Sequence, residues 1–231
     1  MLLFGTFRTA YNTYRSVTSS SRKMKKTPQA ARRPDGRDTA QKAGSLPRAA
    51  DRIRSSAQDL FYHQGIRAVG VDAIVAEAGV TKPSLYRSFA SKDELVVAYL
   101  RDYEVEFWRR FNAAVEAHPG DPRAQILAYF AGLTKRTCMA EYRGCGLTNA
   151  CIEYPEPDHP ARQVSVANKR QVRARLIELA REMGARDPEA LGDGLQLLLE
   201  GACVSSQVFG AEGPVRYLAD TAARLIDASL A

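Results

Sequence analysis

A short row of polar side chains beginning at residue 81 has the chemistry of nucleic-acid recognition. Three hydroxyl groups and two cations fall within seven residues, namely Thr81, Lys82, Ser84, Tyr86 and Arg87. Hydroxyl groups commonly contact phosphates, and Lys and Arg can also read the edges of bases. A solvated face on a small helical hairpin would have the same composition. The row therefore favours a nucleic-acid contact only if the surrounding elements place it on a surface that nucleic acid can reach.

Three cysteines in the C-terminal half form a second group that could do chemistry. Cys138, Cys145 and Cys151 have Cys-x6-Cys-x5-Cys spacing, and acidic residues surround His159. Three sulfurs could bind a soft metal or sense oxidants. No Cys-x2-Cys pair occurs, however, and a cysteine is most often a small buried apolar side chain. We expect no metal and no cofactor, and we keep a thiol- or metal-responsive regulator as an alternative.

Catalytic machinery is not visible in the sequence. His63, His118 and His159 lie far apart, and no Gly-rich phosphate loop occurs. If the protein were an enzyme, Cys145 could be the nucleophile and His159 the base. We expect that the protein is not an enzyme, with a small helical enzyme and a plain helical scaffold as the opposing hypotheses.

The polar row lies on the second of two short predicted helices. The first occupies residues 70–79 and ends at Gly79, where a left-handed residue is favoured. The second begins after Thr81, a favourable N-cap, with Pro83 in its first turn. Two short helices joined by a tight glycine turn are typical of a helix-turn-helix, here residues 70–89.

The remainder of the chain from residue 47 also has helical periodicity. Apolar residues recur at helical spacing over residues 53–64, and Ser91-Lys92-Asp93-Glu94 is a capping box that opens a long helix. Further helices are predicted at 121–142, 149–154, 160–184, 188–209 and 214–230. The predicted fold class is all-α, with an N-terminal three-helix part that contains the helix-turn-helix, followed by a helical bundle.

Charge separates a basic N-terminal segment from an acidic body. Residues 1–50 contain 11 Lys or Arg against 2 Asp or Glu, whereas residues 93–231 contain 16 against 20. A basic arm suggests a polyanionic partner at one end only. Residues 1–46 could be an organelle transit peptide, or an arm that contacts nucleic acid or an anionic membrane. We favour a start at Met24 or an arm without a specific role.

No apolar stretch in the sequence is long enough to cross a bilayer. We therefore expect no membrane partner. The expected location is cytoplasmic, and nucleoid-associated when the protein is bound to DNA.

The motifs around the polar row resemble the DNA-binding domain of the TetR family of transcriptional repressors. Ala78-Gly79-Val80 is similar to the family's turn, and Leu85-Tyr86-Arg87-Ser88-Phe89 to its Leu-Tyr-x-x-Phe recognition helix. Lys92-Asp93-Glu94-Leu95 resembles the start of the next helix. The agreement extends over 48–95, and the rest of the chain resembles the family only as a helical bundle. The expected divisions are a tail at 1–46, the DNA-binding domain at 47–95 and an effector-binding and dimerisation domain at 96–231.

This resemblance implies a sequence-specific DNA-binding regulator of transcription. The simplest form is a homodimeric repressor that an unknown small-molecule effector releases from a palindromic operator in double-stranded DNA. The residues expected to contact DNA are Thr81, Lys82, Ser84, Tyr86, Arg87 and Lys92. Arg48 is added as a candidate phosphate contact, with a merely solvated cation as its alternative.

Two sets of residues in the C-terminal half are candidates for the effector pocket and the dimer interface. The pocket could be lined by Tyr103, Phe107, Trp108, Phe111, Tyr129, Phe130, Met139 and Tyr142, unless these side chains are ordinary bundle core. The last two helices contain stripes of apolar and small residues, which a two-fold interface would bury unless both stripes face the internal core of a monomer. The interface candidates are Leu195, Leu199, Ala202, Ser206, Leu218, Ala222 and Leu225.

Overall fold

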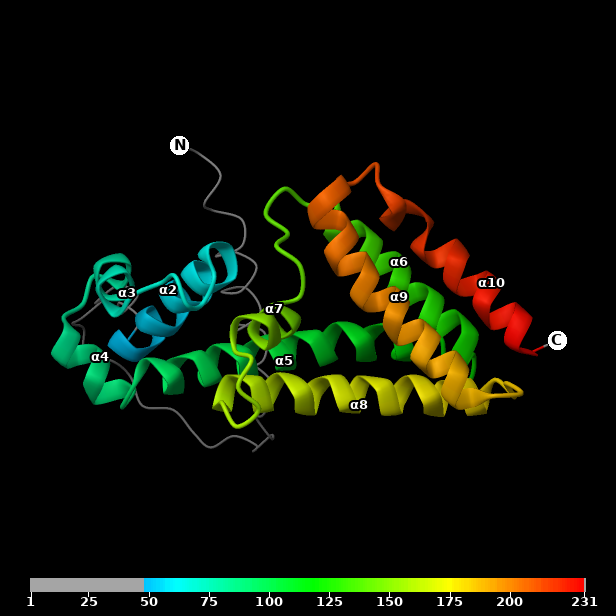
Figure 1. Cartoon of the computed structure of the whole chain (residues 1–231), viewed down its shortest axis with the longest axis horizontal. Helices are drawn as coiled ribbons and strands as arrows, with labels where there is room; N and C mark the ends of the chain where they lie inside the picture. Colours follow the sequence, from blue (N-terminus) through cyan, green and yellow to red (C-terminus); the bar gives the residue numbers. More distant parts are fainter. Residues whose placement is uncertain (1–47, 231) are drawn as a thin grey trace, which may run out of the picture. The chain divides into compact units, whose positions relative to one another are not determined.

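The computed structural model describes residues 48–230, which form helices and contain no strand (Figure 1). The all-α prediction is confirmed. The predicted basic tail at residues 1–46 lies outside the described residues. Among the helices of the described part, none is both long and apolar enough to cross a bilayer.

Three helices form the N-terminal part: α2 (Ala49–Gln64), α3 (Val71–Ala78) and α4 (Lys82–Ser88). The chain turns from α3 into α4 at Gly79, whose φ of 61° is a left-handed conformation that glycine adopts at low cost. The Thr81 hydroxyl caps α4 by accepting a hydrogen bond from the Ser84 amide. The shared core consists of Ile53, Ala57, Phe61, Ile74, Ala78 and Leu85.

A long helix, α5 (Lys92–Glu116), connects this part to the rest of the molecule. The Ser91 hydroxyl accepts a hydrogen bond from the Glu94 amide at 3.1 Å, and the Glu94 carboxylate accepts one from the Ala90 amide at 2.6 Å. These two bonds form a capping box shifted by one residue, which fixes where the helix begins. The helix packs against α2 as well as against three helices of the C-terminal bundle, α6, α7 and α8.

The C-terminal bundle contains α6 (Pro122–Thr137), α7 (Gly146–Glu153), α8 (Pro160–Glu182), α9 (Pro188–Phe209), η1 (Pro214–Tyr217) and α10 (Leu218–Leu230). In Figure 1, α8 runs beside α5, and α9 and α10 lie with α6 at the opposite end from α3 and α4. Asp121 and Asp187 cap α6 and α9 through side-chain hydrogen bonds, each followed by a proline in the first turn.

Two of the predicted helix boundaries are wrong at the connection between α6 and α7. The helix predicted over 121–142 ends at Thr137, and the short helix predicted from residue 149 begins at Gly146. The intervening chain bends through Gly144, which has a φ of 83°. Its carbonyl accepts hydrogen bonds from Tyr62 and Tyr103, so contacts distant in sequence replace continued helix there.

Candidate nucleic-acid interface

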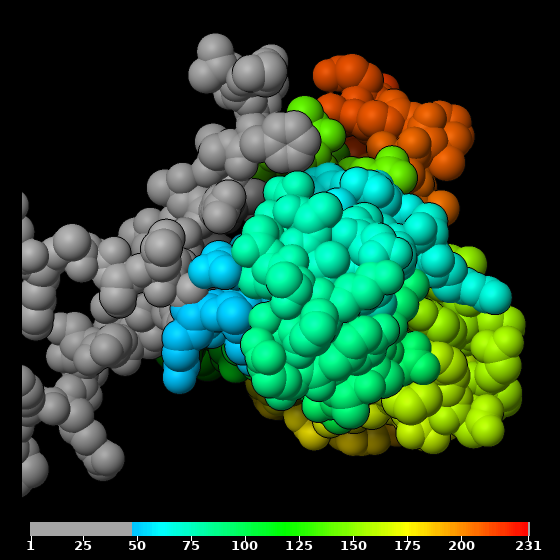
Figure 2. Space-filling model, turned by 90° about the vertical axis from the view of Figure 1, so that its left-hand side faces the viewer, coloured from blue at the N-terminus to red at the C-terminus, as the bar shows by residue number. Residues whose placement is uncertain are grey.

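The polar row forms one exposed face of α4. Thr81, Lys82, Tyr86 and Arg87 are exposed, and Ser84 is half-buried, whereas Leu85 on the same helix is completely buried. In Figure 2 the surface formed by the segment containing α3, α4 and the start of α5 faces the viewer. This arrangement presents donors outward on the second helix of a helix-turn-helix, which is the position from which such proteins read the major groove.

Hydrogen bonds hold the side chains of this face before any ligand arrives. Arg87 Nη2 donates to Ser84 Oγ at 2.8 Å, and Thr81 Oγ1 donates to the same oxygen at 3.2 Å. The Lys82 ammonium lies 2.7 Å from a carboxylate oxygen of Asp72, the second residue of α3. Because these side chains are already ordered, a partner would bind them at a reduced entropic cost.

The two remaining predicted DNA contacts, Arg48 and Lys92, lie at the starts of α2 and α5. The Arg48 side chain is 84% exposed and forms an ion pair with Asp51 at 3.6 Å. Lys92, the first residue of α5, is half-buried, and its ammonium lies 5.9 Å from the centre of the Phe61 ring. Burial lowers the pKa of Lys92. Because Lys92 is half-buried, less of its side chain is available to a phosphate than in the exposed residues Thr81, Lys82, Tyr86 and Arg87.

Contacts between residues 62–67 and residues 143–153 were missed by sequence reasoning. The Glu153 carboxylate accepts a hydrogen bond from the Arg67 amide at 2.7 Å, and Arg67 Nη1 donates to the Glu153 carbonyl at 3.1 Å. Tyr62 accepts from the Arg143 amide at 2.9 Å and donates to the Gly144 carbonyl at 3.1 Å. These bonds join residues more than 80 positions apart, so the N-terminal three-helix part is joined to the C-terminal bundle by more than α5.

The candidate pocket residues divide into separate groups. Phe107, Trp108, Phe111, Tyr129 and Phe130 form an aromatic cluster between α5 and α6, with ring centres 4.9 to 6.5 Å apart. Tyr103 and Tyr142 instead direct their hydroxyls to the Gly144 carbonyl and the Cys203 sulfur. Met139 was predicted to line the pocket, but it follows α6 and is 52% exposed, so it does not line a buried space in this structure.

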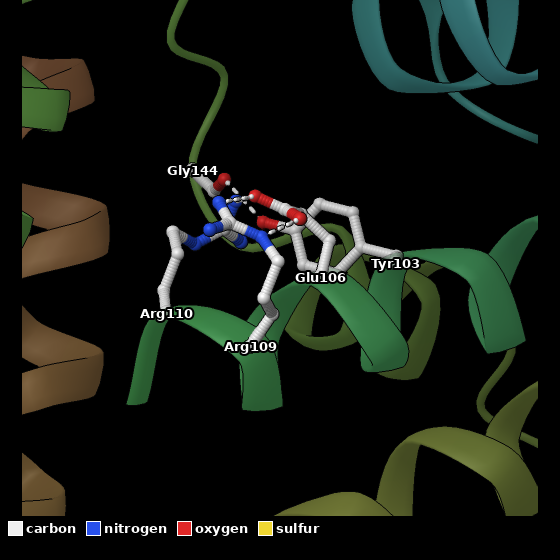
Figure 3. A network of polar contacts seen from close by, with 5 residues as sticks. All are labelled: Tyr103, Glu106, Arg109, Arg110 and Gly144. Carbon is white, nitrogen blue, oxygen red and sulfur yellow. Dashed lines mark hydrogen bonds and ion pairs between the residues drawn. The ribbon is translucent and has the colours of Figure 1, made fainter. Parts of the chain in front are cut away.

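A network of charged residues lies along α5 next to Tyr103. Figure 3 shows Glu106 accepting from both Arg109 and Arg110, close to the Tyr103 hydroxyl and the Gly144 carbonyl. These arginines hold the pKa of Glu106 below its usual value, although burial acts in the opposite direction.

A second polar cluster joins α7, α8 and α9 inside the bundle. The Lys169 ammonium lies 2.7 Å from a carboxylate oxygen of Glu200 and 3.3 Å from the sulfur of Cys145. Thr148 donates to the other Glu200 oxygen at 2.6 Å. Burial opposes the charge on Lys169, but the sulfur and the carboxylate outweigh it and raise the pKa above its usual value.

The three cysteines singled out from the sequence do not form a common site. Cys138 is exposed, Cys151 is half-buried, and Cys145 is buried against Lys169. Cys203, which the spacing argument did not include, is also buried. In the part of the chain that the structure describes, no group of three or more His, Cys, Asp or Glu side chains could hold a metal ion.

The prediction of the dimer-interface residues requires correction. Six of the seven are at most 6% exposed in the single chain, so they have no surface left to bury against a partner: Leu195, Leu199, Ala202, Ser206, Leu218 and Ala222. Leu225 is half-buried. The opposite face of α9 is the one left open, where Leu197, Val204 and Val208 are 73%, 54% and 67% exposed and Gly201 is also exposed.

A family model matches part of the N-terminal half of the chain, and a known regulator matches most of the chain. Residues 53–99 match the family model described as bacterial regulatory proteins, tetR family. The chain is 25% identical over 177 residues to the HTH-type transcriptional regulator YjdC of Escherichia coli (strain K12), a match that covers 76% of this chain and 90% of YjdC.

Solved structures of TetR-family regulators also match most of the chain. SCO4454, a TetR-family transcriptional regulator from Streptomyces coelicolor, matches with a TM-score of 0.71 at 31% identity, over 79% of this chain and 94% of that one. The reduced form of E. coli NemR matches with a TM-score of 0.63 at 20% identity, over 79% and 97%, which is a likeness of fold. NemR, an HTH-type transcriptional repressor, is 25% identical over 89 residues, or 38% of this chain and 45% of NemR.

Proposed function

The chain belongs to the TetR family of bacterial DNA-binding transcriptional regulators, and from this premise we propose that it is a homodimeric repressor of a palindromic operator. The observation that carries the proposal is the exposed, pre-ordered face of α4. In a dimer, two such helices would read half-sites one turn of DNA apart, about 34–36 Å. The hydroxyls of this face would contact phosphates, and Lys82 and Arg87 would contact base edges.

The exposed face of α9 supports the dimer. Leu197, Gly201, Val204 and Val208 are separated by four, three and four residues, so they lie in one stripe along the helix. An apolar stripe of this kind would remain in water in a monomer, and a second copy packed about a two-fold axis would cover it. The small Gly201 would let the two backbones approach closely at the middle of the stripe.

Release from DNA would follow from an effector that binds the C-terminal bundle and favours a different spacing of the two α4 helices. The polar cluster of Lys169, Glu200 and Thr148 supports a site near α7, because α7 also contacts the N-terminal part through Glu153 and Arg67. The aromatic cluster between α5 and α6 is the alternative position, and its rings would have to separate to admit a ligand.

The experiment for the proposed function is selection of bound fragments from genomic DNA with the purified full chain. We expect a small set of fragments that share a palindromic sequence. Enrichment of no sequence would refute the repressor proposal and favour a helical scaffold. Turnover of a substrate would favour the enzyme hypothesis.

One observation favours thiol-dependent release as a second candidate. The Lys169 ammonium donates to the sulfur of Cys145, the residue that precedes α7, and so would stabilise negative charge that develops when this sulfur reacts. Cys145 is buried, so its alkylation by iodoacetamide should be slow, and operator binding should weaken at the same slow rate in the wild type. C145S should resist the treatment. The exposed Cys138 provides the control, since C138S should behave like the wild type. Equal loss of binding in C145S would refute this candidate.

A further inference from the structure

An acidic side chain lies within the face proposed to contact DNA. Asp72, the second residue of α3, is paired with Lys82, the first residue of α4, at 2.7 Å. Both side chains are open to solvent, with 80% and 53% exposure. The hydrogen bond to Asp72 and its negative charge raise the pKa of Lys82. The pair therefore presents a lysine and a carboxylate together to any partner of α4.

This pairing conflicts with the simplest role of a lysine in a DNA-binding face. A lysine that neutralises a phosphate releases a counterion, which strengthens binding to DNA of every sequence. A lysine already neutralised by Asp72 has little such effect, and the Asp72 carboxylate repels a phosphate that approaches it. The geometry thus opposes a phosphate contact by Lys82.

The same geometry suits a contact with a base edge. Lys82 is held at its backbone by the capped first turn of α4, with Thr81 before it and Pro83 after it, and at its ammonium by Asp72. An ammonium has three donors, of which one is used by the carboxylate, so two remain for acceptors such as O6 and N7 of guanine. The second oxygen of Asp72 can accept from the amino group of a neighbouring cytosine.

We propose that Asp72 is a specificity-determining residue, which holds Lys82 toward a base edge and weakens binding to DNA of any other sequence. The inference rests on the proposed reading of DNA by α4. Asp72 acts mainly through Lys82 and is in that respect a positioning residue. Its effect is to lower the affinity for non-specific DNA more than the affinity for the operator.

The test compares D72N with the wild type on the selected operator and on a random duplex of equal length, over a series of salt concentrations. Asparagine keeps an acceptor for Lys82 but removes the charge. We expect random-duplex affinity to rise about three- to tenfold, and the dependence of log K on log salt to steepen by about one for that duplex. The ratio of operator to random affinity should fall about five- to tenfold.

Two further variants separate this role from a structural one. E77Q removes the same charge from an exposed position on the same helix and should change either affinity less than about twofold. In a K82M background, D72N should lower the ratio of affinities far less than in the wild type, because the lysine that Asp72 positions is gone. The midpoint of thermal unfolding of D72N should match that of the wild type.

The outcomes distinguish failure of this inference from failure of the proposed function. A wild type that selects no sequence would overturn both. A wild type that selects its operator, with D72N showing an unchanged ratio and salt dependence, would overturn the role of Asp72 alone. Equal weakening on both duplexes would also overturn it, since that result identifies Asp72 as a structural residue.

Discussion

At the scale of single residues, the DNA-facing side chains are ordered by their neighbours and not only by the helix that carries them. Ser84 accepts from Thr81 and from Arg87, so its hydroxyl oxygen is the centre of a small network. A guanidinium held at one nitrogen retains other donors for two acceptors on a base. Arg87 is therefore the residue of α4 from which we expect the largest single effect on base preference.

Replacement of Arg87 by alanine should weaken operator binding by about 1–3 kcal/mol and relax the base preference at one position of each half-site. The matched control is R181A, because Arg181 lies near the end of α8 in the C-terminal bundle. Titration of both variants against the operator and its single-base mutants measures the effect. Intact affinity and preference in R87A would show that α4 does not read DNA through this residue.

Buried titratable groups predict loss of stability in alkaline solution. Burial raises the pKa of Tyr62 to about 12 and that of Cys203 to about 12, and it also raises those of Tyr99, Tyr129 and Tyr142. Because the unfolded groups ionise first, the stabilisation is complete below about pH 9 and is lost as the pH rises toward 12. Tyr62 alone accounts for about 2–3 kcal/mol by pH 12.

Denaturant unfolding at successive pH values measures this loss. The variant Y62F should be less stable than the wild type at neutral pH, because two hydrogen bonds at residues 143 and 144 are removed. Its stability should nevertheless fall less steeply between pH 10 and 12. A wild-type unfolding free energy that is constant from pH 9 to 12 would contradict the argument.

At the scale of elements, the helix ends set by local caps were predictable, whereas the end of α6, the start of α7 and the packing of helix faces were not. Thr81, Ser91 and Gly79 act through neighbours within four residues, so the sequence alone located α4, the start of α5 and the turn between α3 and α4. Both faces of α9 contain apolar and small residues at helical spacing. Periodicity could not decide that Leu195 and Leu199 face the core of the chain whereas Val204 faces solvent.

Polar contacts between distant elements were equally invisible to sequence reasoning. The pairs Glu153 with Arg67 and Tyr62 with Gly144 join positions 86 and 82 residues apart, and no local pattern marks them. The residues of the recognition face were found because they lie on one short helix. The aromatic candidates were identified as a group, but their division between two places in the bundle depends on tertiary packing.

The contact of α7 with the N-terminal part predicts a local effect of E153A. Loss of the hydrogen bond from the Arg67 amide should cost about 1–2 kcal/mol and should speed amide hydrogen exchange over residues 65–70. Exchange in α8 and α9 should be unchanged. The control is E156A, an exposed acid in the loop after α7, which should leave exchange at residues 65–70 as in the wild type. Uniformly faster exchange would indicate general destabilisation instead.

At the scale of the whole molecule, the proposed dimer predicts that V204R dissociates at micromolar concentration. Arginines would be brought close to one another across the two-fold axis, and the apolar stripe of α9 would lose its middle. The variant V105R is matched to it, because Val105 is a similarly exposed valine on α5. Sedimentation should detect a folded monomer for V204R and a dimer for the wild type and V105R.

Operator binding provides the second measurement on the same variants. A monomer reads one half-site, so V204R should bind the operator much more weakly while V105R binds as the wild type does. A wild type that sediments as a monomer and still binds its operator tightly would refute the dimer.

The close contact of α8 with α9 limits how such a molecule could move. A Cβ at Gly192 would lie 2.5 Å from Ile177 Cγ1 and 3.0 Å from the Ile177 backbone, so the two helices touch almost without intervening side chain. Helices in such close contact cannot easily slide or separate, so α8 and α9 are expected to move as one rigid unit. In the proposed dimer this pair would hold the partner at α9, which leaves movement to the N-terminal helices α2 to α4 and to the chain between α6 and α7. Mechanical compliance would then reside on the side of the molecule nearer to DNA.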